Sequence, residues 1–519
     1  MPSGGRAALT AMHDVAIVGF GPSGEVAAGL LGQMGLSTFV CDRSPEVYDK
    51  PRAISLDHEV MRTFQQLGVV HDIEPHVEAF TPSEYFGVDG QLIKRLTMVA
   101  PPYPLGYTPS NVFTQPPVEA ALRAHVAEHP NAQVALGCEV TSLQQDADSA
   151  TLHLRHDNGR IDTVRARYVI ACDGASSSLR ERVGIALEDL SFDEPWLVVD
   201  VLANERGLAK LPTTSVQFCE PERPCTMVIG PGNHRRWEIS LNPGEDPIKA
   251  CEPAETWKLL SRWLTPDDSE LWRQASYRFH ALVAQRWRAG RVFVAGDAAH
   301  QQPPFLGQGM CQGVRDVANL AWKLASVLRG EVRGAAAEAL LDSYGTERQQ
   351  HVRELTSRIK AIGAVICERD PAKARERDAR MLAECDGVVR DMPRQDVLPR
   401  LECGLLSPTA HAANGTIFPQ PWIAQGDGRV RFDALAGDGW WLVLRSGVDR
   451  GALQPHAGLR LRTMQFGALL QETDGVAEAW FERHGCSAAI VRPDRYVYGV
   501  ATNAIEMQAQ LNALAAQLD

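Results

Sequence analysis

The sequence predicts an α/β protein whose main sheet is parallel. Three apolar runs of strand length end in glycine or aspartate and lead into helical segments; they are residues 15–18, 166–172 and 292–295. Short apolar runs bounded by turn residues are typical of buried parallel strands. Because parallel strands end at the same edge of a sheet, we expect these three ends to form one site for a polar ligand.

The first strand end carries the glycine pattern of a dinucleotide-binding βαβ unit. Gly19, Gly21 and Gly24, with Pro22 and Ser23 between them, come directly after the strand and before a helical stretch. The first two glycines permit a tight turn and close approach to a pyrophosphate, and the third lets helix and strand pack. The strand, the turn and the helix together predict a Rossmann-like sheet.

The next apolar run ends in Asp42-Arg43, 23 residues after Gly19. A carboxylate at this separation accepts hydrogen bonds from ribose hydroxyls. Arg43 and the following segment favour FAD among the dinucleotides. Arg52, beside Ala53 in a loop before a predicted helix, is placed to neutralise a pyrophosphate or to face a flavin ring; a solvated arginine is the alternative interpretation.

The other two strand ends carry Asp173-Gly174 and Gly296-Asp297. A single carboxylate of this kind is equally well explained as a helix N-cap. Three such ends in this order indicate a common ligand site, and the segment 291–313, with its prolines and glycines before a helix, is its centre.

Composition excludes several classes of protein. A chain of 519 residues needs more than one domain, and 45% hydrophobic with 22% charged residues argues against extensive disorder. A net charge of −12 without basic runs argues against nucleic-acid binding. The eleven cysteines contain no CxxC pair, which favours reduced thiols and a cytoplasmic location over disulfides or zinc. No apolar run has membrane-spanning length, and the first 14 residues are interpreted as a floppy lead-in rather than a signal peptide.

Changes in composition and in the pattern of predicted strands and helices divide the chain into four expected parts. The prediction is a discontinuous main domain, an inserted antiparallel sheet with a helix that covers a pocket, a helical connector and a C-terminal domain of short strands with a closing helix. Their respective bounds are 12–186 with 286–345, 187–285, 346–400 and 401–519.

These motifs match a known family. The ordered set GFGPSG (19–24), CDG (172–174) and GDAAH (296–300) resembles the FAD-dependent aromatic hydroxylases, the p-hydroxybenzoate hydroxylase-like class A flavoprotein monooxygenases. Within that class the chain is most similar to the 3-(3-hydroxyphenyl)propionate hydroxylase group. The matching segments are LGQMG (32–36), PRAI (51–54), the run 307–325 and VRPDRYV (491–497). The resemblance implies an FAD-binding main domain and a thioredoxin-like C-terminal domain.

The resemblance also implies a set of residues that contact FAD. They are Gly19, Gly21, Pro22, Ser23, Gly24, Asp42, Arg43, Arg52, Ala53, Gln115, Val140, Asp173, Gly174, Arg180, Gly296, Asp297, Pro304, Gly307, Gln308, Gly309 and Met310. In this family, Asp297 would face the ribityl chain, and Pro304 with the loop to Met310 would lie along the flavin ring. The motif from Asp173 to Arg180 is also linked to the nicotinamide cofactor.

Two features depart from the family pattern. Cys311 stands where the glycine loop often carries asparagine, which removes a side-chain amide near the ring. The thioredoxin-like region contains Cys403 and Cys486 but no redox CxxC, so we expect it to be structural or to support a homodimer.

The activity implied is hydroxylation of a phenolic ring, with NADH or NADPH as reductant and O₂ forming a C4a-hydroperoxyflavin. A monohydric phenol, with a hydroxyphenylpropionate-like acid as the candidate, would be the substrate. Tyr277 and His280, just before the last motif, are candidates for proton transfer, with Pro304 at the ring; a structural histidine is the alternative. Arg223, Arg235 and Arg236 could bind a carboxylate, although solvated arginines are expected.

Three other functions remain open. The same chemistry could act on a polycyclic or heteroaromatic natural product, which a larger cavity would indicate. A flavin-dependent halogenase is disfavoured because no WxWxIP-like stretch occurs. A non-catalytic FAD-binding interaction protein would bind the cofactor without substrate-stimulated NAD(P)H oxidation. No metal, nucleic-acid or membrane partner is expected.

Overall fold

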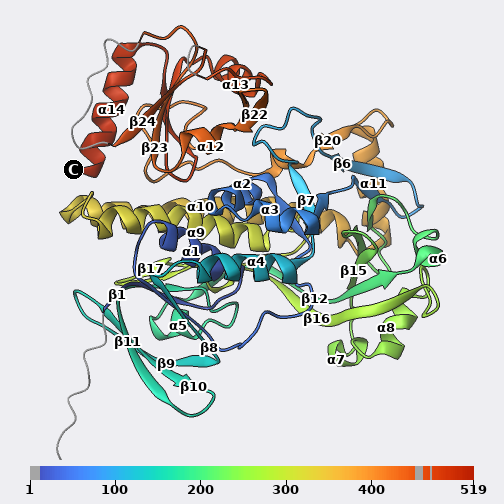
Figure 1. Cartoon of the computed structure of the whole chain (residues 1–519). Coiled ribbons are helices and arrows are strands. Elements are labelled where there is room, and N and C mark those ends of the chain that lie inside the picture. The colour runs from blue at the N-terminus through green and yellow to red at the C-terminus, as the bar shows by residue number, and fades with distance from the viewer. Residues whose placement is uncertain (1–11, 450–459, 468–469) are drawn as a thin grey trace, which may run out of the picture.

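The computed structural model describes residues 12–449, 460–467 and 470–519. Residues 1–11, most of the expected N-terminal lead-in, lie outside the described residues. Figure 1 shows the main sheet at the lower left, a second sheet at the right, and the C-terminal domain above the helices that cover the main sheet. No helix in the described part of the chain is long and apolar enough to span a bilayer.

The main sheet has the parallel core that the sequence predicts. β1 pairs in parallel with β2 and β11, and β11 pairs in parallel with β18, so the three predicted strand ends do lie at one edge. An antiparallel hairpin, β9 and β10, extends from β11. The strands in spatial order are β17 (Arg288–Ala289), β18 (Val292–Val294), β11 (Ile161–Ala171), β1 (His13–Val18), β2 (Thr38–Asp42) and β8 (Ala132–Leu136), with β10 (Ala150–His156) and β9 (Cys138–Gln145) on β11.

Buried helices cover this sheet. α1 (Pro22–Gln33) packs between α4 (Gln115–Ala127) and α9 (Gly309–Leu328). The predicted helix after Arg52 is α2 (His58–Leu67), and its apolar stripe of Val60, Phe64 and Leu67 is buried. Smaller elements complete this part: β3 (Ser55–Asp57), β4 (Val77–Ala79) and β7 (Ser110–Phe113) form a small sheet beside α3 (Val70–Ile73), and α5 (Ser178–Arg182) follows β11.

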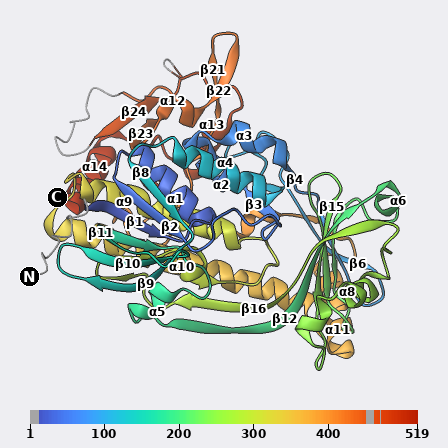
Figure 2. The same ribbon diagram turned by 60° about the horizontal axis from the view of Figure 1, so that its bottom comes forward.

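The second sheet is mainly antiparallel, as expected for the inserted region, and two long strands connect it to the main domain. β12 and β16 pair along most of their length and run from the main domain into the far sheet (Figure 2). Its strands in order are β19 (His300–Gln301), β16 (Ser269–Ala284), β12 (Leu187–Ala203), β15 (His234–Ser240), β14 (Cys225–Ile229), β13 (Ser215–Phe218), β5 (Ser83–Phe86), β6 (Leu92–Thr97) and β20 (Asp391–Pro393). Short helices α6 (Glu205–Leu208), α7 (Pro247–Ala250) and α8 (Pro253–Leu260) join these strands.

The elements do not follow all four expected domain bounds. β5, β6, β19 and β20 belong to the second sheet although they lie outside residues 187–285. The single helix α10 (Gly334–Ile366), followed by α11 (Pro371–Ala383), crosses the expected boundary between residues 345 and 346. Chain segments far apart in sequence therefore build one sheet, which composition alone does not reveal. The division into four domains stays a prediction.

The C-terminal part has the expected thioredoxin-like fold. A sheet in the order β24 (Leu461–Gln465), β23 (Trp440–Leu444), β25 (Ala488–Val491) and β26 (Val497–Ala501) combines one parallel and two antiparallel pairings. Helices α12 (Phe432–Ala436), α13 (Val476–His484) and α14 (Ala504–Leu518) pack around it, and β21 (Trp422–Gln425) with β22 (Gly428–Arg431) forms a separate hairpin.

A buried carboxylate, Glu347 of α10, joins this domain to the rest of the molecule. Its oxygens accept hydrogen bonds from Arg492 at 2.7 and 3.0 Å, and from the backbone N–H of Leu405 at 2.8 Å. Lys323 at 2.8 Å and Asn319 at 2.7 Å donate from α9. Burial alone would raise the pKa of Glu347, but Arg492 and Lys323 outweigh it and lower the pKa to about 2.

We therefore expect Glu347→Gln to lower the free energy of unfolding by about 3–5 kcal/mol at pH 7, because Arg492 and Lys323 lose a buried counter-charge. Since the folded-state pKa lies below the ordinary 4.5, the stabilisation is present above pH 4.5 and is lost as the pH falls toward about 2. Denaturant unfolding, followed by tryptophan fluorescence across this range, measures the difference.

Glu354→Gln on the exposed side of α10 is the matched control and should change stability by less than about 0.5 kcal/mol. Equal stability of Glu347→Gln and the wild type at pH 7 would contradict the role of Glu347.

Candidate functional site

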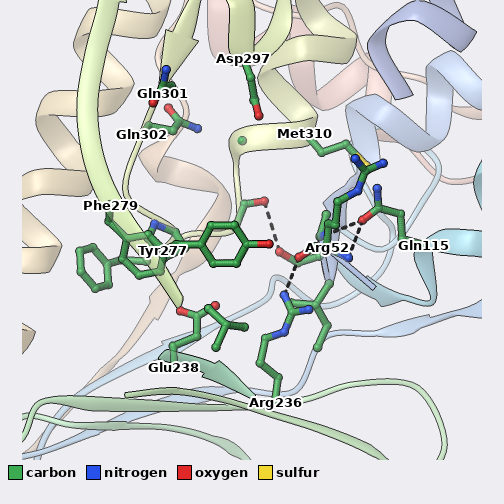
Figure 3. Close-up of a pocket in the computed structure, with 18 of the residues that line it drawn as sticks. Arg52, Gln115, Arg236, Glu238, Tyr277, Phe279, Asp297, Gln301, Gln302 and Met310 are labelled. Carbon is green, nitrogen blue, oxygen red and sulfur yellow. Dashed lines mark hydrogen bonds between the residues drawn. The ribbon is translucent and has the colours of Figure 1, made fainter. Parts of the chain in front are cut away.

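The strand ends of the main sheet and one face of the second sheet enclose a single cavity of about 480 Å³. Figure 3 shows Asp297 and Met310 on one side, Arg52 and Gln115 on another, and Arg236 with Glu238 rising from the second sheet toward the ring of Tyr277. The site therefore lies where the two sheets meet.

The glycine turn after β1 has the geometry that the pattern predicts. A Cβ on Gly19, whose φ is +101°, would lie 2.1 Å from the carbonyl oxygen of Cys172, and one on Gly24 would lie 1.9 Å from that of Gly19. These two glycines allow backbone segments to pack. Gly21 has no atom within 4 Å of such a Cβ, and together with Pro22 and Ser23 it lines the cavity at the N-terminus of α1. The positive end of this helix dipole faces the space where a phosphate would bind.

Arg52 and Gln115 line one wall of the cavity, and hydrogen bonds hold them in place. The Gln115 amide oxygen accepts hydrogen bonds from the backbone N–H groups of Arg52 at 3.0 Å and Ala53 at 2.5 Å. The carboxylate of Glu119 accepts from the Arg52 guanidinium at 2.9 Å and from the Gln115 amide at 2.5 Å. Glu119 thus fixes the two predicted side chains relative to each other, while the Arg52 side chain remains 46% exposed.

The Gly296-Asp297 turn is held from behind by Asp316. This buried carboxylate accepts a hydrogen bond from the Gly296 N–H at 2.9 Å, lies 2.8 Å from His300 Nε2 and pairs with Arg348 at 2.9 Å. Asp297 points away from this network into the cavity (Figure 3). Although its side chain is open to the cavity, the surrounding protein displaces water and raises the pKa of Asp297, while His300 and Arg52 oppose the rise.

The loop before α9 contributes Pro304 and Gly307 to the cavity wall, and the first turn of α9 contributes Gly309 and Met310. Gly307 has φ +62°, and its carbonyl accepts a hydrogen bond from Ser55 at 3.2 Å. Two side chains of this segment, Gln308 and Cys311, do not line the cavity. Gln308 accepts from Arg315 at 2.9 Å, and Cys311 is fully buried in the core. Cys311, in place of the usual asparagine, is therefore a core side chain outside the cavity lining.

Several predicted FAD residues do not line the cavity. Asp42, at the end of β2, accepts hydrogen bonds from the N–H groups of Phe20 at 2.6 Å and Ser44 at 2.7 Å, and Arg43 is exposed. Val140 is buried in β9. The remaining ones outside the lining are Gly19, Gly24, Asp173, Arg180, Gly296 and Gln308.

Asp173 and Arg180 form the second motif, and both have structural partners. Asp173 accepts from Ser177 Oγ and from the Leu179 N–H at 3.1 Å at the start of α5. Arg180 donates to the carbonyls of Ala175 at 3.1 Å and Ala298 at 3.3 Å. The motif thereby ties the end of β11 to the Asp297 turn, whereas Gly174 lines the cavity.

Both predicted proton-transfer candidates lie in the cavity wall on β16. The ring of Tyr277 projects into the cavity (Figure 3). Its hydroxyl accepts a hydrogen bond from Arg273. His280 is one-third exposed, with Nδ1 3.6 Å from a carboxylate oxygen of Asp193. Phe279 stacks against Trp196 at a centroid distance of 5.7 Å.

The expectation of solvated arginines is wrong for Arg236. Its guanidinium is buried, forms two hydrogen bonds with Asp200 at 2.7 and 3.0 Å, and donates to the carbonyls of Arg52 at 2.9 Å and Pro51 at 3.3 Å. The alternation of residues in this strand does not predict that Arg236 is buried. It does not predict the ion pair with Asp200 either, because Asp200 lies on the neighbouring strand. Arg223 pairs with Glu245 at 2.7 Å on the surface.

Sequence reasoning missed four charged residues of the cavity lining: Arg273 and Arg278 on β16, and Glu238 and Arg394. Glu238 of β15 is buried at 6% exposure, and burial raises the pKa of its carboxyl to about 7 despite the opposing charge of Arg236. Arg394 donates to Leu306 O at 2.9 Å and Ser83 Oγ at 3.3 Å and lies over Phe80. Glu238 could have been found from its position, two residues after Arg236 in an apolar strand. Arg394 begins a short 3-10 helix, Arg394–Val397, and no sequence pattern indicates that it reaches the cavity.

Comparison with known proteins agrees with this geometry. Residues 12–359 match the family described as the FAD binding domain, and residues 415–517 match the HcaD C-terminal domain. The chain belongs to this family of FAD-binding proteins, which confirms the recognition from the three motifs.

Two relatives cover nearly the whole chain. A probable NADH-specific resorcinol 4-hydroxylase of Rhodococcus jostii (strain RHA1) is 37% identical over 99% of this chain and 96% of its own length. A 3-(3-hydroxy-phenyl)propionate/3-hydroxycinnamic acid hydroxylase of Klebsiella pneumoniae is 33% identical over 97% and 94%.

Solved structures share the complete fold. The flavin-dependent monooxygenase PieE, in complex with FAD and substrate, superposes with a TM-score of 0.82 at 22% identity, covering 98% of this chain and 99% of that one. Aklavinone-11 hydroxylase, with FAD and aklavinone, gives 0.78 at 24% identity, covering 97% and 98%.

Asp297→Ala should weaken FAD retention, because the variant removes the one cavity-facing side chain of the turn that Asp316 holds in place. Flavin content after purification and dialysis, read from absorbance, measures the effect. Asp148→Ala, on the exposed β9–β10 turn, is the control and should keep full flavin. Unchanged flavin content in Asp297→Ala would remove its assigned role.

Proposed function

We propose that the protein is an FAD-dependent monooxygenase that uses NADH or NADPH and O₂ to hydroxylate a phenolic ring of a small aromatic substrate. The observation that carries this proposal is the shared cavity, in which the FAD strand ends meet a partly apolar, partly charged face of the second sheet. The names of the two relatives, both hydroxylases of phenolic compounds, support it.

The cavity walls fit the predicted cofactor contacts. Three cavity-lining glycines, Gly21, Gly174 and Gly309, have no atom within 4 Å of an added Cβ, so each leaves open space along the course from the α1 N-terminus to the α9 loop. We place the pyrophosphate at the glycine turn beside Arg52, the ribose at Asp42, the ribityl chain at Asp297 and the flavin ring along Pro304 and Met310.

The protein's own task is to hold and shield the substrate. Bound FAD accepts electrons from the nicotinamide and activates O₂. Phe279, Phe305 and Val198 supply apolar surface that excludes water from the ring to be hydroxylated. Tyr277 and His280 remain candidates for handling the phenolic proton, and Arg273 donates a hydrogen bond to the Tyr277 hydroxyl.

The size of the cavity favours a single-ring substrate over the polycyclic alternative. The same space of about 480 Å³ must take the ring system of the cofactor as well as the substrate. The room that remains suits one aromatic ring with a short substituent.

Arg394 is the residue we assign to an acidic substituent of the substrate. It lines the cavity, and two neutral groups, Ser83 Oγ and the Leu306 carbonyl, hold its guanidinium. Among the side chains that the structure describes, no carboxylate forms an ion pair with it. Burial lowers the pKa of Arg394, because the guanidinium has lost much of its hydration. A carboxylate of the substrate would supply the charge-assisted hydrogen bonds that the neutral neighbours do not.

Arg394→Met should raise KM for 3-(3-hydroxyphenyl)propionate by about 30-fold or more, since a buried charge-assisted contact is worth about 2–5 kcal/mol. KM for resorcinol, which has no carboxylate, should change little. Steady-state kinetics with both compounds separates the two effects, and Arg390→Met, exposed in the same segment, is the control. Equal losses for both phenols would argue against a carboxylate site.

Stopped-flow reduction of the purified holoenzyme by NADH and NADPH, across a panel of phenols, tests the function. We expect at least one small phenol to accelerate flavin reduction and to return a product with one added hydroxyl group. Bound FAD that no phenol influences would favour a non-catalytic FAD-binding interaction protein instead. A cytoplasmic location and a homodimer stay predictions from the sequence.

A further inference from the structure

The cavity floor contains a carboxylate without a partner. Glu238, Val198 and Thr226 lie side by side on β15, β12 and β14, and all three line the cavity. In the described part of the chain, the Glu238 side chain forms no hydrogen bond or ion pair, although only 6% of the residue is exposed. A buried carboxyl group in this position is costly unless something in the cavity uses it.

The register of the sheet explains why Glu238 is unpaired. Its nearest cation, Arg236, lies two residues earlier on the same face and is bound by both oxygens of Asp200. Asp200 also lies 2.7 Å from His234 Nε2 and 3.6 Å from the Arg273 guanidinium. The Asp200 carboxylate on β12 therefore binds the nearby cations, and the Glu238 carboxylate faces the open cavity.

We propose that Glu238 is a catalytic residue that binds a ring hydroxyl of the aromatic substrate and accepts its proton. This inference rests on the proposed function. The O–H bond of the phenol breaks, the proton moves to a carboxylate oxygen of Glu238, and the electron pair stays on the ring oxygen. The ring becomes electron-rich, as hydroxylation requires, and the proton later leaves Glu238 to solvent.

The groups around Glu238 suit this transfer. Burial raises the pKa of Glu238 to about 7, so the carboxylate and the acid interconvert near neutral pH. A phenol in water ionises near pH 10, so the phenolate must be stabilised. The charged and titratable groups that face this space are Arg236 and Asp200 beside Glu238, Arg273, Tyr277, Arg278 and His280 on β16, and Arg52, Asp297, His300 and Arg394 on the other walls.

Glu238 and Arg394 together define where the substrate lies. Ser83, which holds Arg394, is on β5, three strand positions from β15, or roughly 14 Å at a spacing of about 4.8 Å. The Glu238 side chain extends into the cavity from β15, and the Arg394 guanidinium lies at Ser83 on β5. A ring with its hydroxyl at Glu238 and a short acidic chain toward Arg394 would span this distance.

The test compares Glu238→Gln with the wild-type holoenzyme. In the wild type, kcat/KM for 3-(3-hydroxyphenyl)propionate and for resorcinol should rise with pH through about 7, the pKa of Glu238. Glu238→Gln should abolish this rise and lower kcat/KM by about 10²–10⁴-fold, with FAD content unchanged. Glu238→Asp should keep the rise of kcat/KM with pH, and its kcat/KM should fall less than that of Glu238→Gln. Glu222→Gln, exposed in the same region, is the matched control and should keep both the rate and the profile.

A second measurement does not depend on turnover. The ultraviolet difference spectrum of each bound phenol should show phenolate forming with a midpoint near 7 in the wild type and not in Glu238→Gln. The proposal would be overturned if Glu238→Gln kept the wild-type midpoint of phenolate formation or the wild-type kcat/KM. It would also be overturned if the rise of kcat/KM with pH disappeared only in His280→Gln. Loss of folding or of FAD in both Glu238 variants would overturn it as well. If the wild type hydroxylates no phenol at all, the proposed function fails instead.

Discussion

The bond between Asp200 and Arg236 is the interaction on which the architecture of the site depends. It is buried between two strands of the second sheet, and the same guanidinium donates to the carbonyls of Pro51 and Arg52 in the first domain. One ion pair thus fixes the second sheet against the loop that carries Arg52. Because Asp200 is committed to this contact, the charge of Arg236 is largely cancelled, and Glu238 keeps the high pKa of an uncompensated buried acid.

The cofactor half of the site could be predicted from the sequence because it depends on local patterns. A buried strand, a glycine turn and a helix occur within about 20 residues, and parallel pairing then brings separate copies of the pattern to one edge. Gly21, Gly174 and Asp297 reach the cavity in this way. Asp173 and Arg180 belong to the motif at the second strand end, yet both form hydrogen bonds with backbone groups near the cavity. The motif therefore predicted where the two residues lie better than it predicted what they contact.

The substrate half could not be predicted in the same way, since its neighbours are set by pairing between distant strands. Glu238 faces Val198 and Thr226 only because of the register of β12, β14 and β15. Arg394 reaches the cavity from a segment that follows α11, and β5 joins the sheet from the first hundred residues. Hydrophobic alternation identifies the face of each strand, but it does not say which charges on two faces meet or which cancel.

The two long strands β12 and β16 have an evolutionary consequence. Near one end, β16 pairs with β19, beside the turn that carries Asp297, and farther along its length it supplies Tyr277 and Phe279 to the cavity. Substitutions at Tyr277 and Phe279 can remodel the substrate surface while Leu282 and Val283, a few residues farther along the strand, keep their pairing with β19 beside the cofactor turn. A lineage can therefore change its substrate range by point mutation, without insertions and without rebuilding the flavin site. This arrangement of β12 and β16 belongs to a fold that the chain shares with aklavinone-11 hydroxylase.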